Sequence, residues 1–260
     1  MRFFLLILAW AAFQIPVAAQ PALSAHRGSA PGFPENTLAT FRAVLQRPIR
    51  YIEIDVRTTK DGQLIILHDG QLDRTTTGLG PVANRTLAEV KQLSAGKGFG
   101  ELFKDERVPT LKEAGQLLRD WNQTSNRKVH LYVDCKAVQP QPLVEELAAL
   151  KLLDDAVFYG SDAFLLALKQ VFPRAKLMPS LRTVDQIKAK IQALQPYAFD
   201  VSGSALTAEL VQQIHAHGIQ VFTDALDAFE TAEHYQKAAS LGVDVIQTDE
   251  VERVSRALKQ

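Results

Sequence analysis

The chain has 260 residues, of which 47% are hydrophobic, so one large domain suits it better than two small ones. Its 29 Lys and Arg residues balance its 29 Asp and Glu residues, and the formal net charge is zero. This balance excludes a general basic surface for nucleic acid or an anionic membrane, so any positive charge that meets a phosphate has to be local.

The first 19 residues are typical of a cleaved secretory signal peptide. A positively charged Arg2 precedes an apolar run over residues 3–12, and small residues stand just before Gln20. The run is short for a membrane-spanning helix, and no cysteine directly follows it that could carry a lipid anchor. We therefore expect an exported bacterial protein, periplasmic or secreted, without a stable membrane anchor, whose mature domain spans residues 20–260.

The first predicted strand covers residues 22–25 and ends at His26, which an arginine and a glycine follow. This order suits a strand that passes into a tight loop. A helix through Gln46 comes next, and either Asn36 or Thr37 caps it. For His26 alone, a structural imidazole is a simpler interpretation than a catalytic one.

The second predicted strand carries two acids, Glu53 and Asp55. Ile52, Ile54 and Val56 alternate with them, so an extended strand points the apolar residues one way and both carboxylates the other. Like charges about 7 Å apart hinder each other's ionisation, and a bound divalent cation removes that cost. Taken alone, the pair is also compatible with a solvated polar face on an edge strand.

A long excursion over residues 57–108 follows this strand. The turn residues 59–62 predict that residues 64–68 fold back antiparallel on the strand and return His68 toward the two acids. The regular turn signals in the rest of the excursion favour an ordered cap over a disordered loop. His68 and His26 together with the acid pair favour a site, although each histidine alone does not.

From residue 110 the pattern becomes regular, and it predicts a (β/α)8 TIM barrel with an insertion after its second strand. Helices are expected at 111–121, 142–150, 163–171, 184–194, 208–217, 229–241 and 251–258, and strands at 129–134, 156–159, 176–179, 197–201, 219–223 and 244–247. An open doubly wound sheet is the alternative, but the single Gly28 does not supply its glycine-rich phosphate turn.

Several polar residues fall at the carboxyl ends of the predicted strands, where barrel chemistry gathers. They are His26, Asp55, Asp134 and Asp249. Glu53, Asp55 and Asp134 would form an all-oxygen metal site, which suits Ca²⁺ or Mg²⁺ better than Zn²⁺. Arg27 and Lys136 would supply the local positive charge for a phosphate, and His26 and His68 are the candidate general acid and base.

Two other groups of residues are expected to stay outside this chemistry. Cys135, the only cysteine, lies in an apolar strand and is better interpreted as buried and inert than as a nucleophile. His215 and His217 are two apart on a predicted helix, face different ways and are better interpreted as surface residues than as ligands.

Five motifs in this order resemble the glycerophosphodiester phosphodiesterase family. They are H-R-G at 26–28, P-E-N-T at 34–37, I-E-I-D-V at 52–56, T-x-D-G at 59–62 and H-D at 68–69. The likeness continues at 72–80, 108–113, 242–244 and 248–249. It implies a barrel with an insertion that hydrolyses a small glycerophosphodiester to glycerol 3-phosphate and an alcohol, with either water or the neighbouring glycerol hydroxyl as the first attacking group.

The sequence departs from the family pattern at three places. Asp134 stands where family members usually carry Glu, which shortens the reach of that metal ligand by one methylene. Phe222-Thr223-Asp224-Ala225 replaces the usual Trp-Thr-Val-Asn, and Glu250 replaces a usual proline. Because these last positions help to shape the alcohol pocket in the family, the head group stays open, as does the oligomeric state.

Three alternatives remain beside hydrolysis of soluble diesters. A phosphodiesterase of the same fold would act on intact lysophospholipid or sphingolipid and would need an exposed apolar rim around the mouth. A non-catalytic exported binding barrel would explain the altered segment at 222–225. A metal-dependent sugar isomerase would explain acids at strand ends, but not two histidines that flank an arginine-glycine turn.

Overall fold

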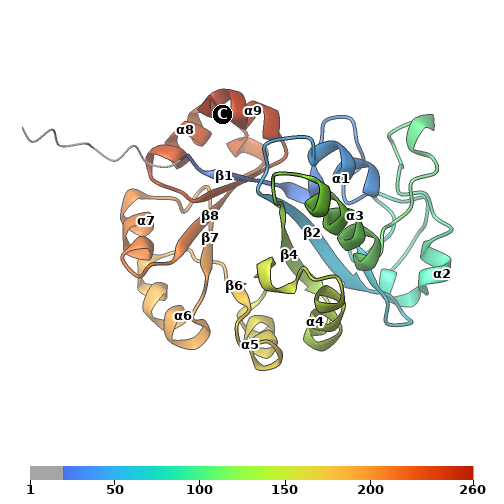
Figure 1. Ribbon diagram of the computed structural model, residues 1–260, viewed down its shortest axis with the longest axis horizontal. Helices are drawn as coiled ribbons and strands as arrows, with labels where there is room; N and C mark the ends of the chain where they lie inside the picture. The colour runs from blue at the N-terminus through green and yellow to red at the C-terminus, as the bar shows by residue number, and fades with distance from the viewer. Residues whose placement is uncertain (1–19, 260) are drawn as a thin grey trace, which may run out of the picture.

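Eight parallel strands form a ring at the centre of the computed structural model, which describes residues 20–259 (Figure 1). Their order is β6 (Lys176–Met178), β5 (Val157–Tyr159), β4 (His130–Ala137), β2 (Tyr51–Thr58), β1 (Ala22–Ala25), β9 (Val245–Thr248), β8 (Gln220–Ala225) and β7 (Ala198–Ser202). The ring closes through a bridge between Ser180 and Asp200, where the Leu181 amide donates to the Asp200 carbonyl at 2.7 Å. The predicted TIM barrel is therefore confirmed, while the predicted signal peptide lies outside the described residues.

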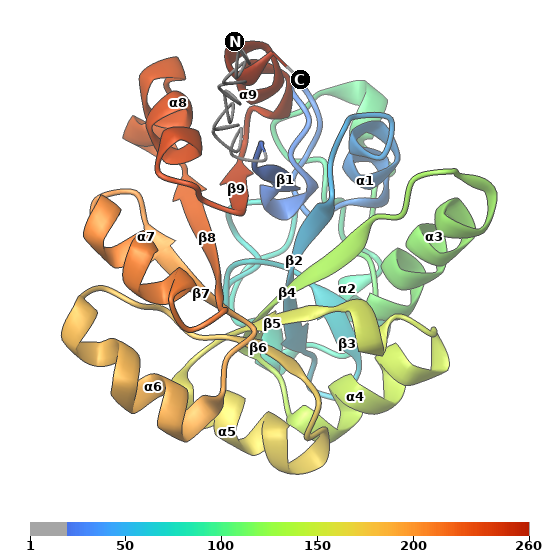
Figure 2. The ribbon, with the colours of Figure 1, turned by 60° about the vertical axis from the view of Figure 1, so that its left-hand side comes forward.

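Helices surround the strands on the outside of the ring, as Figure 2 shows. They are α1 (Leu38–Val44), α3 (Leu111–Thr124), α4 (Pro140–Ala149), α5 (Asp162–Val171), α6 (Ile187–Leu194), α7 (Ala208–His215), α8 (Ala232–Ser240) and α9 (Val251–Leu258). Thr37 caps α1 by accepting a hydrogen bond from the Thr40 amide, so Thr37 and not Asn36 is the cap. In residues 20–259, no helix combines the length and the apolar character needed to cross a membrane.

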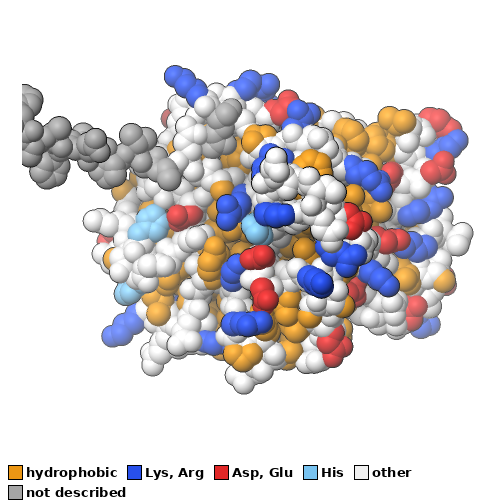
Figure 3. All heavy atoms as spheres, viewed as in Figure 1, with side chains coloured by type: hydrophobic (Ala, Val, Ile, Leu, Met, Phe, Trp, Pro, Cys, Tyr) orange, Lys and Arg blue, Asp and Glu red, His pale blue; other side chains and the backbone are white. Residues whose placement is uncertain are grey.

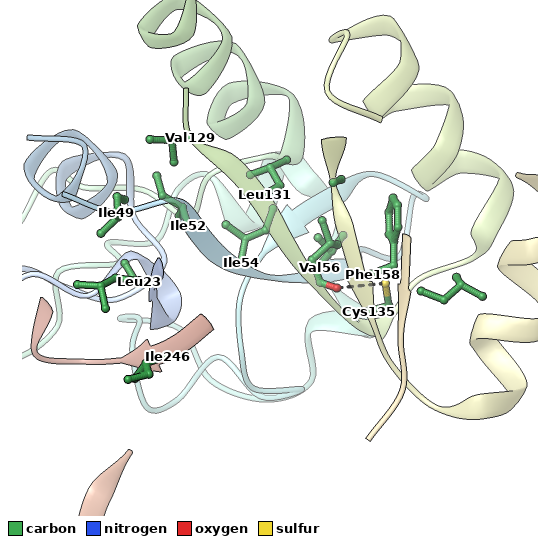
Figure 4. Packing of buried hydrophobic residues seen from close by; sticks show 14 of the residues in the cluster. Leu23, Ile49, Ile52, Ile54, Val56, Val129, Leu131, Cys135, Phe158 and Ile246 are labelled. Carbon is green, nitrogen blue, oxygen red and sulfur yellow. Dashed lines mark hydrogen bonds between the residues drawn. The ribbon is translucent and has the colours of Figure 1, made fainter. Parts of the chain in front are cut away.

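The core has two layers because the strand residues alternate between the helices and the barrel interior. Ile52, Ile54 and Val56 of β2 pack outward in the main apolar cluster, part of which is drawn in Figure 4. A smaller cluster fills the floor of the barrel, and it contains Tyr51, Tyr132, Val157, Met178, Ala198, Phe222 and Val245. The polar residues farther along the same inward faces therefore rest on a packed apolar floor.

The insertion over residues 57–108 lies beside the barrel, to the right in Figure 1. Its strand β3 (Leu64–Ile66) pairs antiparallel with β2, with Val56 opposite Ile66, as the turn at 59–62 predicts. A short helix, α2 (Leu87–Val90), begins at a capping box formed by Thr86 and Glu89. The insertion has an apolar cluster separate from that of the barrel, made of Ile65, Leu67, Leu72, Val82, Val90, Ala95 and Val108.

Candidate active site

Three carboxylates converge at the carboxyl ends of β2 and β4. Glu53 and Asp55 point into the barrel and are only 2% and 1% exposed, and Asp134 on β4 lies opposite Asp55 in the strand register. One oxygen from each of the three carboxylates lies within 4.8 Å of the others. Because β2 is a central strand between β1 and β4, the alternative of a solvated edge strand is wrong. The aspartate at position 134 still reaches the other two acids.

Two basic residues contact this acidic cluster. The Lys136 Nζ lies 2.6 Å from Asp134 Oδ2 and 3.4 Å from Asp55 Oδ1. The Arg27 backbone amide donates to Glu53 Oε2 at 2.7 Å, and its Nε lies 3.7 Å from Asp55 Oδ2. Arg27 adopts a left-handed backbone conformation with φ 52°, and this turn directs its amide at Glu53. Three acids against two bases give the cluster one formal negative charge when every acid is ionised.

The electrostatics of the cluster fit a divalent cation. Burial, followed by the charges of Asp55 and Asp134, raises the pKa of Glu53 well above its usual value. Burial also raises the pKa of Asp134, although Lys136 opposes this shift. A cation bound among these oxygens would remove the repulsion that hinders ionisation, and an all-carboxylate set suits Ca²⁺ or Mg²⁺.

Each candidate catalytic histidine is paired with a carboxylate through its Nδ1. The Nδ1 of His26 lies 2.9 Å from Asp249 Oδ1, and the Nδ1 of His68 lies 2.6 Å from Asp69 Oδ1. The two side chains are 14% and 32% exposed. A carboxylate at Nδ1 fixes the orientation of an imidazole and leaves Nε2 to exchange a proton with a ligand.

Both partner carboxylates favour their ionised form. The hydrogen bond from Arg74 lowers the pKa of Asp69 strongly, with a further contribution from His68. Burial pushes the pKa of Asp249 upward, but the hydrogen bond and charge of His26 outweigh it and leave that pKa lowered. Both carboxylates are therefore negative at neutral pH and stabilise a protonated imidazole.

The motif residues also form contacts that sequence reasoning did not assign. Arg74 joins the two loops of the site, because its Nη1 lies 2.7 Å from Glu35 Oε2 and its Nε 2.7 Å from Asp69 Oδ2. The Asn36 side chain donates to Asp55 Oδ2 at 2.7 Å. The P-E-N-T and H-D motifs were the available signal for Glu35, Asn36 and Asp69, whereas nothing local in the sequence links Asp249 to His26.

Cys135 and His215 lie where the sequence predicts. The Cys135 side chain is buried, its Sγ is 3.6 Å from the Val133 carbonyl oxygen (Figure 4), and burial raises the pKa of its thiol. His215 is partly exposed at the end of α7, and its Nε2 lies 2.9 Å from Asp244 Oδ2. Neither residue takes part in the acidic cluster.

A cavity of about 480 Å³ opens on the other side of the barrel mouth. Its lining comes from the ends of β5, β7 and β8 and the segment after β6, and includes Tyr159, Ser180, Arg182, Asp200, Ser202 and Asp224. Acidic, basic and histidine side chains gather near the middle of the face seen in Figure 3. The mouth thus combines a cluster of acids and histidines with a cavity large enough for a small organic molecule.

The chain matches the model of the glycerophosphoryl diester phosphodiesterase family over residues 26–253. It is 31% identical over 243 residues to a glycerophosphodiester phosphodiesterase of Caldanaerobacter subterraneus subsp. tengcongensis, which covers 91% of this chain and 97% of the relative. A glycerophosphodiester phosphodiesterase of Bacillus subtilis is 32% identical over 220 residues, covering 75% of this chain and 73% of the relative.

Solved structures show the same fold. A phosphodiesterase of Oleispira antarctica, solved in complex with the product sn-glycerol-3-phosphate, superimposes with a TM-score of 0.79 at 27% identity and covers 93% of this chain and 98% of its own. A glycerophosphodiester phosphodiesterase of Agrobacterium tumefaciens gives a TM-score of 0.81 at 24% identity, covering 91% of this chain and 100% of its own.

Proposed function

Because the chain belongs to the glycerophosphoryl diester phosphodiesterase family and is a phosphodiesterase of that kind, we propose a metal-dependent mechanism in which His26 and His68 are the general acid and base. The substrate in this proposal is a small glycerophosphodiester, and the products are glycerol 3-phosphate and an alcohol. The observation that carries the proposal is the convergence of three carboxylates with two carboxylate-held imidazoles at one barrel mouth.

Glu53, Asp55 and Asp134 would hold the metal, which is Ca²⁺ or Mg²⁺ in this proposal. When bound, such a cation polarises the phosphoryl group and neutralises the charge that develops in the transition state. Lys136 lies beside two of the ligands and Arg27 beside the third, so both are placed to bind phosphate oxygens.

The two histidines divide the proton transfers. One imidazole accepts the proton of the attacking oxygen through Nε2, and the other donates a proton to the departing alkoxide. Asp249 and Asp69 keep the two rings in position and stabilise whichever ring is protonated. Each histidine is expected to contribute about 10²- to 10⁴-fold to the rate. The product bound in the Oleispira antarctica structure supports glycerol 3-phosphate as the product here.

The test uses purified protein stripped with a chelator and assayed on glycerophosphocholine and glycerophosphoethanolamine. We expect no turnover until Ca²⁺ or Mg²⁺ is restored, and no recovery in Asp55→Ala at the same metal concentration. Asp244→Asn, which removes a carboxylate paired with the surface His215, is the matched control and should recover fully. Full activity of Asp55→Ala would refute the metal assignment, and tight binding without turnover would favour the binding-barrel alternative.

We also propose that the protein is exported to the periplasm or the medium, because residues 1–19 are typical of a secretory signal peptide. Fractionation of cells that express the full chain should place the processed protein outside the cytoplasm. Recovery of unprocessed protein in the cytoplasmic fraction would contradict this proposal.

A second candidate function, hydrolysis of intact lysophospholipid, has one observation in its favour. Leu79, Phe99 and Leu102 on the insertion are 68%, 43% and 85% exposed. Phe99 packs on Phe103, whose ring contacts Phe33 in the loop that follows the catalytic His26 and Arg27. Phe99 therefore links an exposed apolar side chain of the insertion to that loop through Phe103. Turnover of lysophospholipid vesicles without turnover of soluble diesters would favour this candidate over the first.

A further inference from the structure

A second pair of carboxylates lies inside the barrel, on β7 and β8. Asp200 is opposite Phe222 in the strand register, and Asp224 is opposite Ser202, so the two acids are diagonal neighbours on adjacent strands. Phe222 belongs to the barrel floor, and both acids line the 480 Å³ cavity above it. Asp224 stands in the segment where the sequence departs from the family pattern.

This pair has no basic partner among residues 20–259. Asp200 is 93% buried, because only 7% of it is exposed, and its carboxylate makes no hydrogen bond or ion pair with the described residues. Within this part of the chain, Asp224 accepts only one side-chain hydrogen bond, from Gln247 Nε2 at 3.1 Å. The nearby Lys136 is already paired with Asp134 and with Asp55. The Asp200 carboxylate opens onto the cavity without a protein partner, so a cation in the cavity would meet an unpaired carboxylate.

The electrostatics agree with this interpretation. Burial, followed by the charges of Asp224 and Asp134, raises the pKa of Asp200 well above its usual value. Burial also raises the pKa of Asp224, while the charge of His26 opposes the shift. The strand register places the cavity beside the metal ligands, because Tyr159 of the cavity lining is opposite Asp134 on the neighbouring strand. The acid pair and the reaction centre therefore share one barrel mouth.

We propose that Asp200 and Asp224 bind the cationic group of the substrate alcohol, so that the enzyme prefers glycerophosphodiesters whose alcohol carries an amine or ammonium group. This inference rests on the proposed function, because it assigns the alcohol part of that substrate to the cavity beside the metal ligands. An organic cation in the cavity gives Asp200 the partner it lacks. Tyr159, which also lines the cavity, adds an aromatic ring of the kind that attracts ammonium groups.

Two features of the cavity argue for an organic cation rather than a second metal ion. Within the described residues, the only group of three or more potential metal ligands close to one another is Glu53, Asp55 and Asp134. The cavity volume of about 480 Å³ fits a small organic group and greatly exceeds that of a single ion. Arg182 also lines the cavity, but it is an exposed residue whose charge is screened by solvent.

The experiment compares two substrates that differ only in this charge. Glycerophosphoethanolamine has a protonated amine where glycerophosphopropanol has a methyl group. We expect the wild type to favour the amine by about 10- to 100-fold in kcat/KM, as for a hydrogen bond to a charged group. In the Asp200→Asn/Asp224→Asn double variant, this ratio should fall to within about threefold of one, because kcat/KM for the amine diester falls more than kcat/KM for the propanol diester.

Asp185→Asn is the matched control, because it removes one negative charge from an exposed residue that follows Arg182 by three positions and is not part of the cavity lining. It should leave the substrate ratio unchanged. If the wild type shows no preference, or if the double variant loses activity on both substrates equally, the inference is wrong and the acids serve the glycerol part or the fold. If the double variant fails to fold, the single Asp224→Asn variant should still lower the ratio.

A binding measurement separates this inference from the proposed function. The Kd of His68→Ala for the same two diesters, measured by calorimetry with Ca²⁺ present, should favour the amine by about 10- to 100-fold. If the wild type hydrolyses neither diester while His68→Ala still binds the amine selectively, the proposed catalysis is overturned and this inference stands. Equal Kd values would overturn the inference even if hydrolysis is observed.

Discussion

In the proposed mechanism, the proton transfers depend on the carboxylate partners of the two histidines. Asp249 lies 2.9 Å from His26, and Asp69 lies 2.6 Å from His68, in both cases at Nδ1. Since this contact sets which nitrogen faces the ligand, loss of the carboxylate should misplace the ring without removing it.

We predict that Asp249→Asn lowers kcat by about 10²- to 10⁴-fold, because an amide can hold His26 in the wrong tautomer. The metal affinity should change by less than about threefold, since Asp249 is not among the three converging acids. Steady-state kinetics and a metal titration measure the two effects. His215→Ala, which breaks another histidine-aspartate pair at the surface, should leave kcat unchanged.

Glu53 makes the stability of the metal-free protein depend on pH. Its pKa in the folded state lies well above the ordinary value of 4.5, because it is buried beside Asp55 and Asp134. The folded protein therefore holds a proton that the unfolded chain releases above pH 4.5. The free energy of unfolding should fall as pH rises from 4.5 through the folded pKa.

The neutral isostere Glu53→Gln avoids this loss, since its side-chain oxygen can still accept the Arg27 amide hydrogen bond. With chelator at pH 7, we expect the variant to melt above the wild type, by about 2–4 °C for each kcal/mol gained. At pH 4 the two melting temperatures should converge. A variant that melts below the wild type at pH 7 would contradict the interpretation of Glu53 as a strained, buried acid.

At the scale of the element, β3 returns His68 to the mouth, and one arginine on β2 fixes the end of this strand. Arg57 donates to the His68 carbonyl oxygen from Nε at 2.9 Å and from Nη2 at 2.6 Å. The planar guanidinium donates two hydrogen bonds to one carbonyl oxygen, and the single ammonium group of a lysine does not reproduce this geometry.

We predict that Arg57→Lys lowers kcat by about tenfold, because His68 becomes less well positioned. The melting temperature of the barrel should change by only a few degrees. Arg85→Lys, an exposed replacement on the same insertion, serves as the control and should leave kcat unchanged. An Arg57→Lys variant with wild-type kcat would show that residues 64–68 keep their position without the two Arg57 hydrogen bonds.

The elements were largely predictable from the sequence, and the contacts between distant elements were not. The alternation in β2 and the turn at 59–62 lie within one short segment, and together they predict the pairing of β2 with β3. The contact of His26 with Asp249 depends on the parallel pairing of β1 with β9, and the two residues are 223 positions apart in the sequence. Asp200 was not identified from the sequence either, because a strand with one acid between Phe199 and Val201 looks like an ordinary buried strand.

Two helix starts differ from the sequence prediction for a local reason. Val184–Gln186 and Asp227–Phe229 form short 3₁₀ turns, so α6 and α8 begin later than the hydrophobic pattern suggests. The apolar residues of such turns continue the spacing of the helix that follows them, and this spacing alone does not mark the boundary.

At the scale of the whole molecule, the proposed metal site joins two neighbouring strands of the ring. Glu53 and Asp55 belong to β2 and Asp134 belongs to β4. A cation that binds these three acids in the folded state alone stabilises that state by mass action.

We predict that Ca²⁺ or Mg²⁺ at 100 times its Kd adds about 2.7 kcal/mol to the free energy of unfolding. This corresponds to a rise of about 5–10 °C in Tm for a chain of this size. Excess chelator should reverse the rise, and Asp55→Asn should show almost none of it in differential scanning calorimetry. An equal rise in Asp55→Asn would place the stabilising ion elsewhere.

Most buried apolar residues of the insertion form a cluster of their own, although Leu64 and Ile66 of β3 pack in the barrel cluster, and each unit supplies one of the two imidazoles. Local opening of the smaller unit would withdraw His68 while the ring and its three acids stay intact. We therefore expect activity to disappear on gentle heating several degrees before the cooperative calorimetric transition, and to return on cooling. In this state the three acids would still be placed to bind the proposed divalent cation, so the cell would hold a folded, metal-loaded and inactive form of the enzyme.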